Sequence, residues 1–246
     1  MFPRHIEEAA LSAWPATQQI LYDGWLLRFG GGYTRRSNSV TPLYESALDL
    51  DDKITYCAAR YTERNLRPVF RITPFNTSPG LDQALERRGY RLEAPSLTQA
   101  RELSSLTVSA PDGLRDDPLD DWIGHFCGLR GDSPAIQQAH HAILQTIPSR
   151  CFLGSLVDES GAVVACGVAV LEGAYAGLFD VIVNPAQRGQ GYGSALVAGL
   201  LHWAQAGGAR YAYLQVMAQN APARHVYESK FGFETVYDYW YRVLDR

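Results

Sequence analysis

The apolar positions of this chain follow a two-residue period in some segments and a helical period in others. Between positions 196 and 204 they recur at helical spacing, and Gly207 and Gly208 then provide a typical helix end. The flanking segments 175–185 and 211–217 are rich in aromatic and β-branched residues, which predicts strands. Strands that alternate with helices predict an α/β fold in which helices cover a sheet.

The residues before this unit predict one strand, two helices and a hairpin. In chain order these are a strand over 106–113, helices over 117–131 and 133–147, and paired strands over 151–158 and 162–173. An Asp or a Ser precedes each helix as a cap, and the hairpin turns at residues 159–161.

The two halves of the chain repeat one pattern at an offset of 143 positions, which is 183 minus 40. Three pairs of segments share this gapless register: 40–42 with 183–185, 68–74 with 211–217, and 88–90 with 231–233. Each half contains a strand ending in Val-x-Pro, a helix, an aromatic-rich strand, a short helix and a terminal strand. We therefore expect a smaller α/β domain over 1–103 that is a pseudo-repeat of the domain over 104–246.

Composition and charge narrow the classes of function. The chain has 246 residues, and its net charge of −4 comes from 22 basic and 26 acidic side chains. Without a basic excess, we expect no binding to the phosphate backbone of a nucleic acid. The longest apolar run, 162–171, is too short to cross a bilayer, and the N-terminal residues show no signal-peptide pattern. The four cysteines lack CxxC or metal-site spacing, so we expect reduced thiols, no metal and a cytoplasmic location.

The segment most informative about chemistry is QRGQGYGSAL, residues 187–196. It follows a predicted strand and opens a predicted helix. Its glycines at 189, 191 and 193 allow successive backbone N–H groups to point into one concavity, where the helix N-terminus adds partial positive charge. Arg188 adds a full charge and Ser194 a hydroxyl, so the segment predicts a pyrophosphate site.

Two common phosphate motifs do not fit this segment. A Walker loop has a lysine before its Ser or Thr, whereas here Gly193 precedes Ser194 directly. A dinucleotide fingerprint has its third glycine three residues after the second and an acidic residue ending the next strand. Here the third glycine follows the second by two residues, and the next strand ends at Gln215-Val216-Met217.

The pattern Arg188-x-x-Gly191-x-Gly193 after a Val-x-Pro turn resembles motif A of the GNAT superfamily of acetyltransferases. The downstream residues Asn220, Ala223, Tyr227 and 231–233 are similar to the pattern that closes the catalytic core of that family, and a terminal strand follows. The resemblance covers about residues 104–246. It implies a mixed, mostly antiparallel sheet flanked by helices, with acetyl-CoA as cosubstrate and an amine as acceptor.

The resemblance also implies roles for individual residues. The pyrophosphate would be held by the amides of Arg188, Gly189, Gly191, Gly193 and Ser194. The strand edge at Val181 and Val183 would pair with the pantetheine arm, and Asn220 would contact the cofactor. Asn220 is also a plausible plain N-cap before Pro222, and both roles are compatible.

The matching segment of the first half lacks the features that favour phosphate binding. At the offset of 143, Glu45 replaces Arg188, and no glycine stands at the positions of the three loop glycines. Four acids lie in this turn: Glu45, Asp49, Asp51 and Asp52. We therefore expect a degenerate half that does not bind the cofactor.

The predicted reaction is direct acetyl transfer from acetyl-CoA to a primary amine of a small molecule or peptide. By the resemblance, Tyr227 protonates the leaving thiolate or donates a hydrogen bond to it. Asp180 is the candidate that orients or deprotonates the amine, with a structural aspartate as the alternative. Glu172 and His225 are weaker candidates, because His225 is expected to face away from Tyr227 on a helix.

Some alternatives remain open at this point. A non-catalytic acyl-CoA-binding module is the second functional hypothesis, and a scaffold for a protein partner is the third. His140 and His141 are expected at the surface or partly buried. The loop over 30–40 contains three glycines, Arg35 and Arg36, and we favour a turn with solvated arginines over an anion pocket. The acceptor's identity and the oligomeric state are not encoded in a recognisable pattern.

Overall fold

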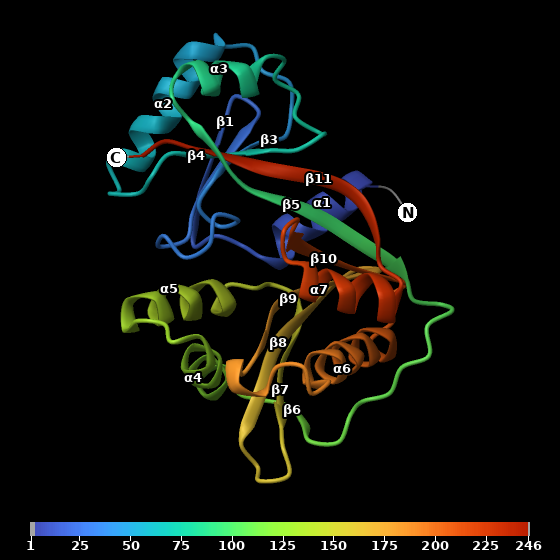
Figure 1. Cartoon of the computed structure of the whole chain (residues 1–246). Helices are drawn as coiled ribbons and strands as arrows, with labels where there is room; N and C mark the ends of the chain where they lie inside the picture. The colour runs from blue at the N-terminus through green and yellow to red at the C-terminus, as the bar shows by residue number, and fades with distance from the viewer. Residues whose placement is uncertain (1–2, 246) are drawn as a thin grey trace.

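The computed structural model describes residues 3–245, which form one eleven-stranded sheet with helices on both faces (Figure 1). The strands are Gln18–Tyr22 (β1), Trp25–Phe29 (β2), Val40–Pro42 (β3), Val69–Ile72 (β4), Arg91–Glu102 (β5), Leu114–Asp116 (β6), Arg150–Val157 (β7), Val163–Glu172 (β8), Tyr175–Val183 (β9), Tyr211–Met217 (β10) and Glu234–Val243 (β11). Most neighbouring pairs are antiparallel, and β3–β4 and β9–β10 are parallel. The predicted fold class is confirmed.

Within residues 3–245, the first half of the chain contributes three helices and the second half four. They are Pro3–Ala13 (α1), Leu50–Thr62 (α2), Leu81–Arg87 (α3), Leu119–Arg130 (α4), Pro134–Gln145 (α5), Tyr192–Ala206 (α6) and Ala221–His225 (α7), with a 3-10 turn at Pro185–Gln187 (η1) and a π-helical turn at Val226–Lys230 (η2). The predicted helices over 117–131 and 133–147 are therefore confirmed as α4 and α5. The predicted hairpin is confirmed as β7 and β8.

The two halves exchange their terminal strands. The sheet order is β1-β2-β3-β4-β11-β5-β10-β9-β8-β7-β6. The terminal strand of the first half, β5, pairs with β10, and the terminal strand of the second half, β11, pairs with β4. These two strands also pair with each other at the centre of the sheet. The predicted boundary at residue 104 thus falls after β5, whereas the sheet continues from one half into the other.

Separate apolar cores cover the two faces of the second half. On one face, α6 packs its apolar stripe, including Leu196 and Leu200, against β8 and β9. On the opposite face, α1, α4 and α5 contribute Ala13, Trp122 and Ile143 to another core, which also contains Trp14 just after α1. Figure 1 shows α4 and α5 on the side of the sheet away from α6 and α7. The sheet therefore separates two environments that meet only where its strands part.

The expected strand over 106–113 is wrong. This segment is irregular up to β6, and it runs across α6 rather than along a neighbouring strand. Pro111 and Leu114 lie over Gly199 of α6, where an added Cβ would approach within 2.3 Å of Leu114 Cδ2. Pro111 has no backbone N–H to donate to a ladder, which favours this path.

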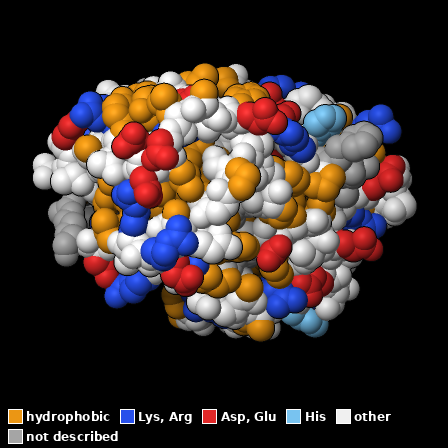
Figure 2. Space-filling model, turned by 90° about the horizontal axis from the view of Figure 1, so that it is seen from above, with side chains coloured by type: hydrophobic (Ala, Val, Ile, Leu, Met, Phe, Trp, Pro, Cys, Tyr) orange, Lys and Arg blue, Asp and Glu red, His pale blue; other side chains and the backbone are white. Residues whose placement is uncertain are grey.

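The surface carries charges of both signs. Figure 2 shows acidic and basic side chains interspersed with apolar patches on the face seen from above. Within residues 3–245, no helix combines the length and apolar character needed to cross a membrane.

Candidate active site

Two parallel strands part in the middle of the second half. The pairing of β9 with β10 ends at Leu178 and Leu214, although both strands continue for several residues. The Asn184 N–H donates to Val164 of β8 at 2.8 Å. Because successive residues of a strand direct their backbone groups to opposite edges, Val181 and Val183 direct theirs to the edge that β10 has left. This edge matches the one predicted for a bound extended chain.

The loop between β9 and α6 presents unpaired backbone donors. Gly189 and Gly191 adopt positive φ values of 80° and 91°, which side-chain-bearing residues rarely tolerate. The Ala195 N–H donates to the Gly191 carbonyl at 3.0 Å and closes the first turn of α6. The amides of residues 192–194 precede this bond and lack an intrahelical acceptor. The helix N-terminus therefore offers donors and partial positive charge to an anion.

The predicted cofactor residues line one cavity of about 540 Å³. The cavity brings together Val181, Val183, Arg188, Gly189, Gly191, Gly193, Ser194, Asn220 and Tyr227. An added Cβ on Gly193 would lie 3.3 Å from Val183 Cγ2, so a larger residue there would narrow the space between β9 and α6. Segments from β9, α6, α7 and η2 thus surround one space that opens on the parted strands.

Tyr227 reaches this cavity from the π-helical turn η2. Its side chain is only 8% exposed, and its ring meets Phe233 edge-on at a centroid distance of 6.1 Å. Burial raises the pKa of Tyr227 to about 12, so the phenol stays protonated at neutral pH. A protonated phenol is a hydrogen-bond donor, as the donor role predicted for Tyr227 requires.

The same turn corrects one prediction and adds residues that the sequence did not indicate. His225 lines the cavity together with Tyr227 instead of facing away from it. The π-helical turn changes the angular spacing that a regular α-helix would impose. Lys230, at the end of η2, also lines the cavity, and no phosphate motif includes it.

Asn220 is the N-cap of α7, which is one of the two roles predicted for it. Its side-chain oxygen accepts a hydrogen bond from the Ala223 N–H at 3.3 Å, and Pro222 occupies the first turn of α7. Asn220 also lines the cavity. The cap therefore positions Asn220 at the cavity wall.

Asp180 lies on the other face of the sheet because of a β-bulge. The pairing of β9 with β8 shifts between Phe179 and Ile182, and Asp180 adopts φ 49°. Phe179 and Asp180 consequently both turn toward the core under α1 and α5, whereas Val181 turns to the α6 side. Asp180 Oδ2 lies 2.7 Å from His140 Nε2, and both side chains are buried.

His140 is fully buried, so its expected surface position is wrong. Four aromatic rings surround its imidazole: Trp14, Tyr33, Trp122 and Phe126. Its Nδ1 has no hydrogen-bond partner among residues 3–245. The neighbouring His141 is part-exposed and contacts Asp120, 3.0 Å away. The weaker base candidate Glu172 accepts a hydrogen bond from Ser149 and does not line the cavity.

The prediction of solvated arginines in the loop over 30–40 is wrong for Arg36. Its guanidinium lies over the Trp14 ring at 5.2 Å and over the Phe179 ring at 5.4 Å. Arg35, by contrast, is part-exposed and forms an ion pair with Glu93. The loop thus places Arg36 next to Phe179, the residue before Asp180.

Comparisons with known proteins agree with this geometry. The family model described as "Probable histone acetyltransferase Rv0428c C-terminal" matches residues 3–242. The chain belongs to the GNAT superfamily of acetyltransferases. An N-acetyltransferase of Bacillus subtilis, YobR, described as uncharacterized, is 30% identical over 250 residues, covering 98% of both chains. The probable histone acetyltransferase Rv0428c of Mycobacterium tuberculosis is 34% identical over 120 residues, covering 49% of this chain and 37% of that protein.

Solved GNAT structures share the fold at low sequence identity. A GCN5-related N-acetyltransferase from Kribbella flavida superposes with a TM-score of 0.70 at 15% identity, covering 97% of this chain and 94% of that chain. A tandem GNAT protein from the clavulanic acid biosynthesis pathway gives a TM-score of 0.60 at 16% identity, covering 90% of this chain and 78% of that chain.

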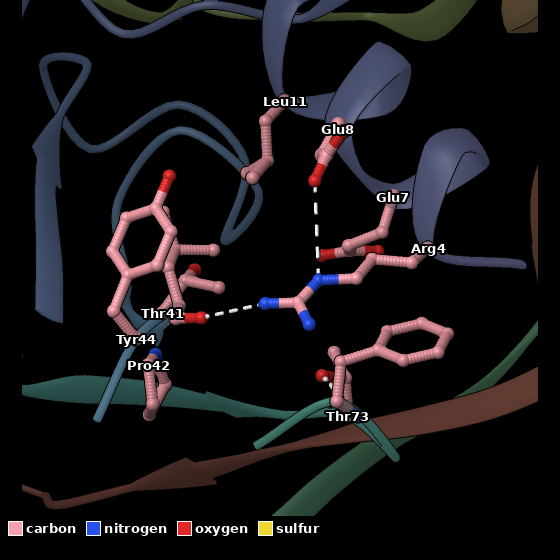
Figure 3. Close-up of a pocket in the computed structure, with 10 residues that line it drawn as sticks. Arg4, Glu7, Glu8, Leu11, Thr41, Pro42, Tyr44 and Thr73 are labelled. Atoms are coloured by element: carbon pink, nitrogen blue, oxygen red, sulfur yellow. Dashed lines mark hydrogen bonds and ion pairs between the residues drawn. The ribbon is translucent and has the colours of Figure 1, made fainter. Parts of the chain in front are cut away.

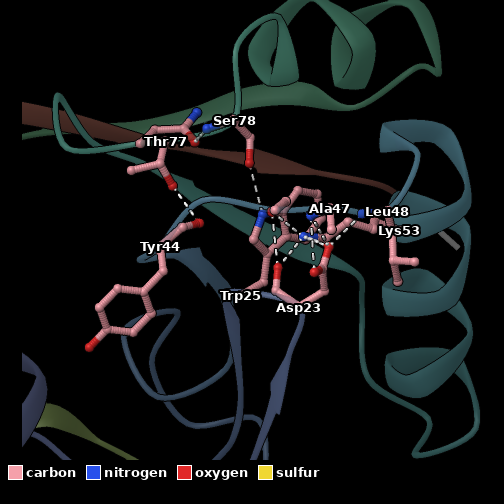
Figure 4. A network of polar contacts seen from close by, with 10 residues as sticks. Asp23, Trp25, Tyr44, Ala47, Leu48, Lys53, Thr77 and Ser78 are labelled. Carbon is pink, nitrogen blue, oxygen red and sulfur yellow. Dashed lines mark hydrogen bonds and ion pairs between the residues drawn. The ribbon is translucent and has the colours of Figure 1, made fainter.

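The corresponding loop in the first half of this GNAT chain is filled by one of the chain's own carboxylates. Asp23, in the turn between β1 and β2, accepts hydrogen bonds from the N–H groups of Ala47 and Leu48 at 3.0–3.1 Å (Figure 4). Lys53 Nζ lies 3.0 Å from Asp23 Oδ2, and its side chain is 1% exposed. These amides, together with the pairing to Lys53, lower the pKa of Asp23. In this half, Asp23 therefore holds the loop amides just ahead of α2, and the side chain of Asp49 accepts from the Asp51 and Asp52 amides of the helix itself.

Proposed function

We propose that the protein transfers an acetyl group from acetyl-CoA directly to a primary amine. The observation that carries this proposal is the cavity beside the parted strands, where unpaired loop amides, an open strand edge and a buried tyrosine meet. The acceptor would approach from the face of Asp180, which we call the acceptor face. The amine would meet the acetyl group where the pairing of β9 with β10 has ended.

Groups around the cavity match the two polar parts of acetyl-CoA, its diphosphate and its pantetheine arm. The amides at residues 188–194 and the Arg188 guanidinium suit the diphosphate of acetyl-CoA. Val181 and Val183 suit the amides of a pantetheine arm, which would add to the sheet as a short strand. Asn220 would contact the cofactor from the start of α7.

The chemistry requires a neutral amine and a stabilised thiolate. An alkyl amine with a pKa near 10.4 is almost fully protonated at pH 7, so one proton must leave before attack. We assign acceptance of that proton, directly or through water, to Asp180. The amine nitrogen forms a C–N bond with the acetyl carbon, and the C–S bond breaks. Tyr227 donates a hydrogen bond to the departing sulfur, which leaves as the CoA thiolate and takes up the second proton that the nitrogen loses as the amide forms.

A non-catalytic acyl-CoA-binding module would need only the cavity lined by the predicted cofactor residues, with no proton donor or acceptor beside it. The buried, protonated Tyr227 at the cavity wall and the Asp180–His140 pair on the acceptor face favour catalysis over storage. Protein lysines belong on the test panel of acceptors because the mycobacterial relative is named a probable histone acetyltransferase.

The test combines acetyl-CoA binding with release of the CoA thiol over a panel of primary amines. The panel contains amino acids, aliphatic amines, an amino sugar and a histone-tail peptide. We expect saturable acetyl-CoA binding and thiol release that depends on at least one amine. Binding without amine-dependent release would support the storage module, and absence of binding would contradict both functions.

A further inference from the structure

Three arginines on the acceptor face carry charge that the chain does not neutralise. Arg28, Arg36 and Arg71 line a small cavity of about 10 Å³ together with Ala10, Leu11 and Gln215. Arg28 and Arg71 are each only 3% exposed, and Arg36 is half-buried. Buried guanidinium groups normally have carboxylate partners, because an unpaired buried charge is costly.

Arg28 is paired with backbone carbonyl groups only. Its guanidinium donates to the carbonyl oxygens of Leu11, Trp14 and Arg36. Within residues 3–245, no carboxylate lies within 4.0 Å of its nitrogen atoms. Burial lowers the pKa of Arg28 to about 10, with Arg36 adding to the effect, and the group remains a cation at neutral pH.

The other two arginines leave donors free. Arg71 forms an ion pair with Glu7 of α1, yet its Nε and Nη2 atoms are buried without a hydrogen-bond acceptor. The Arg36 guanidinium contacts only aromatic rings and, across residues 3–245, has no ion pair. Three cations therefore share one carboxylate, Glu7, around this cavity.

Other arginines in this region have carboxylate partners. In the adjoining cavity, Arg4 reaches the carboxylate of Glu8 at 3.9 Å and the Leu43 carbonyl at 3.1 Å (Figure 3). Arg35 and Arg67 both pair with Glu93. The cluster of Arg28, Arg36 and Arg71 thus differs from its surroundings because its three cations have one carboxylate, Glu7, between them.

The cluster is placed where the acetyl group would emerge. The pairing of β9 with β10 ends at Leu178 and Leu214, so Phe179 and Gln215 are the first residues beyond it. Arg36 lies over the Phe179 ring, and Gln215 lines the arginine cavity. An acceptor that reaches the parted strands from this face would therefore meet the half-buried Arg36 first, with Arg28 and Arg71 behind it.

We propose that the acceptor is a primary amine that carries a carboxylate, bound by Arg36 and Arg71 with Arg28 behind them. This inference rests on the proposed acetyl transfer. The guanidinium fork matches the two oxygens of a carboxylate, and the cavity has room for about one water-sized polar group, which suits a carboxylate oxygen better than a phosphate. The same positive charge disfavours a lysine-rich peptide, because like charges at a binding site reduce affinity.

The test uses pairs of amines that differ only in a carboxylate: lysine and cadaverine, histidine and histamine, and tyrosine and tyramine. Amine-dependent thiol release from acetyl-CoA gives kcat/KM for each member. We expect the carboxylated member of at least one pair to be preferred by about 10- to 100-fold, as for a charge-assisted contact to a partly buried arginine. A histone-tail peptide is expected to be a poor substrate.

Three variants at two neighbouring positions show whether the preference depends on Arg36. Arg36→Leu should abolish the preference by raising KM for the carboxylated amine, and Arg36→Lys should restore part of it. Arg35→Leu is the control, because Arg35 is part-exposed, pairs with Glu93 and does not line the cavity, so the preference should remain.

The outcomes separate this inference from the proposed function. Acetylation of decarboxylated amines or the peptide as efficiently as carboxylated ones would overturn the carboxylate assignment and leave acetyl transfer intact. A preference that Arg36→Leu leaves unchanged would overturn it as well. Failure to acetylate any amine would remove the proposed function, and this inference with it.

Discussion

The two halves of this chain place the same anion-binding device at equivalent positions and use it differently. At the offset of 143, the loop before α2 corresponds to the loop before α6. Before α2, the N–H groups of Ala47 and Leu48 point toward one point ahead of the helix, and Asp49 caps the amides of the helix itself. Before α2, the Asp23 carboxylate occupies that point and Lys53 supports it. Before α6, the donors face a cavity of about 540 Å³.

The comparison shows how a binding loop becomes a structural one. A helix N-terminus requires acceptors whether or not a ligand exists. In the first half the chain supplies both acceptors, Asp49 for the helix amides and Asp23 for the loop amides, so no ligand is needed there and no glycine stands at the equivalent loop positions. The equivalent of Tyr227 is Ala84, which is buried in the core of the first half, so the hydroxyl that we propose as the hydrogen-bond donor is absent there too.

The largest expected effect follows from reversing one charge in each of the two loops. Arg188→Glu should weaken acetyl-CoA binding by about 100-fold or more, because a charge-assisted contact becomes a repulsion. The equivalent reversal, Glu45→Arg, should leave binding at the second half unchanged and create no new site. Isothermal titration of both variants measures this. Equal affinity of Arg188→Glu and the wild-type protein would contradict the assignment of the loop.

A second change separates catalysis from binding. Tyr227→Phe removes only the hydroxyl and should lower kcat by about 10- to 100-fold, while the acetyl-CoA Kd stays within about twofold. Tyr211→Phe is the matched control, since Tyr211 stacks on Tyr175 away from the cavity. An unchanged kcat in Tyr227→Phe would exclude the hydroxyl as the donor.

The pH dependence of kcat gives a second test of Tyr227 as the hydrogen-bond donor. Because burial raises the pKa of Tyr227 to about 12, the hydroxyl should remain protonated between pH 8 and about pH 10. We expect no decline of kcat over that range that depends on Tyr227. A decline in the wild-type protein that disappears in Tyr227→Phe would show that the phenol ionises earlier and would contradict the donor role.

A third change tests the structural use of the first loop. Asp23→Asn leaves buried Lys53 without its carboxylate and should lower the thermal midpoint by several degrees at pH 7 without affecting acetyl-CoA binding. The folded-state pKa of Asp23 lies below its unfolded value, so its stabilisation is present above about pH 4 and is lost as the pH falls through the lowered value. The difference between wild type and variant should therefore shrink in acid.

The control for this change lies in the same loop. Asp49 caps α2, and Asp49→Asn keeps a capping side chain, so we expect little change in the thermal midpoint. An Asp23→Asn protein as stable as the wild type at pH 7 would contradict the structural role of the carboxylate.

The smallest expected effect comes from alanine substitutions at two glycines that have similar backbone geometry. Gly89 and Gly189 have φ values of 82° and 80°, and an added Cβ would meet no atom within 4 Å at either position. Alanine should cost about 1 kcal/mol of folding stability at each, measured by urea unfolding. Only Gly189→Ala should also reduce acetyl-CoA affinity, by up to about tenfold. Equal loss of affinity in both variants would indicate an indirect effect.

The fold was predictable as far as local patterns determine it. Apolar periodicity located α4, α5 and α6, and the gapless repeat located the matching elements of the first half. The exchange of β5 and β11 was not predictable, because the choice between equivalent sheet partners depends on contacts between distant residues. The irregular path of residues 106–113 depends on Pro111 packing over Gly199, which is also a long-range contact.

The candidate site was predictable where a linear motif carries it. The loop glycines, Arg188 and Tyr227 follow a fixed spacing, and the structure brings them to one cavity. The acceptor face has no such motif. The contact between Asp180 and His140 depends on a bulge at φ 49°, and the arginine cluster is assembled from α1-facing positions on β2, β4 and the loop over 30–40.

The number of acetyl-CoA molecules bound per chain tests the comparison most directly. Isothermal titration of the wild-type protein should give one site per chain, and the Arg188→Glu variant should show none over the same concentration range. Two sites in the wild-type protein, or one site that survives in Arg188→Glu, would show that the second loop is not the sole phosphate cradle and would contradict the account.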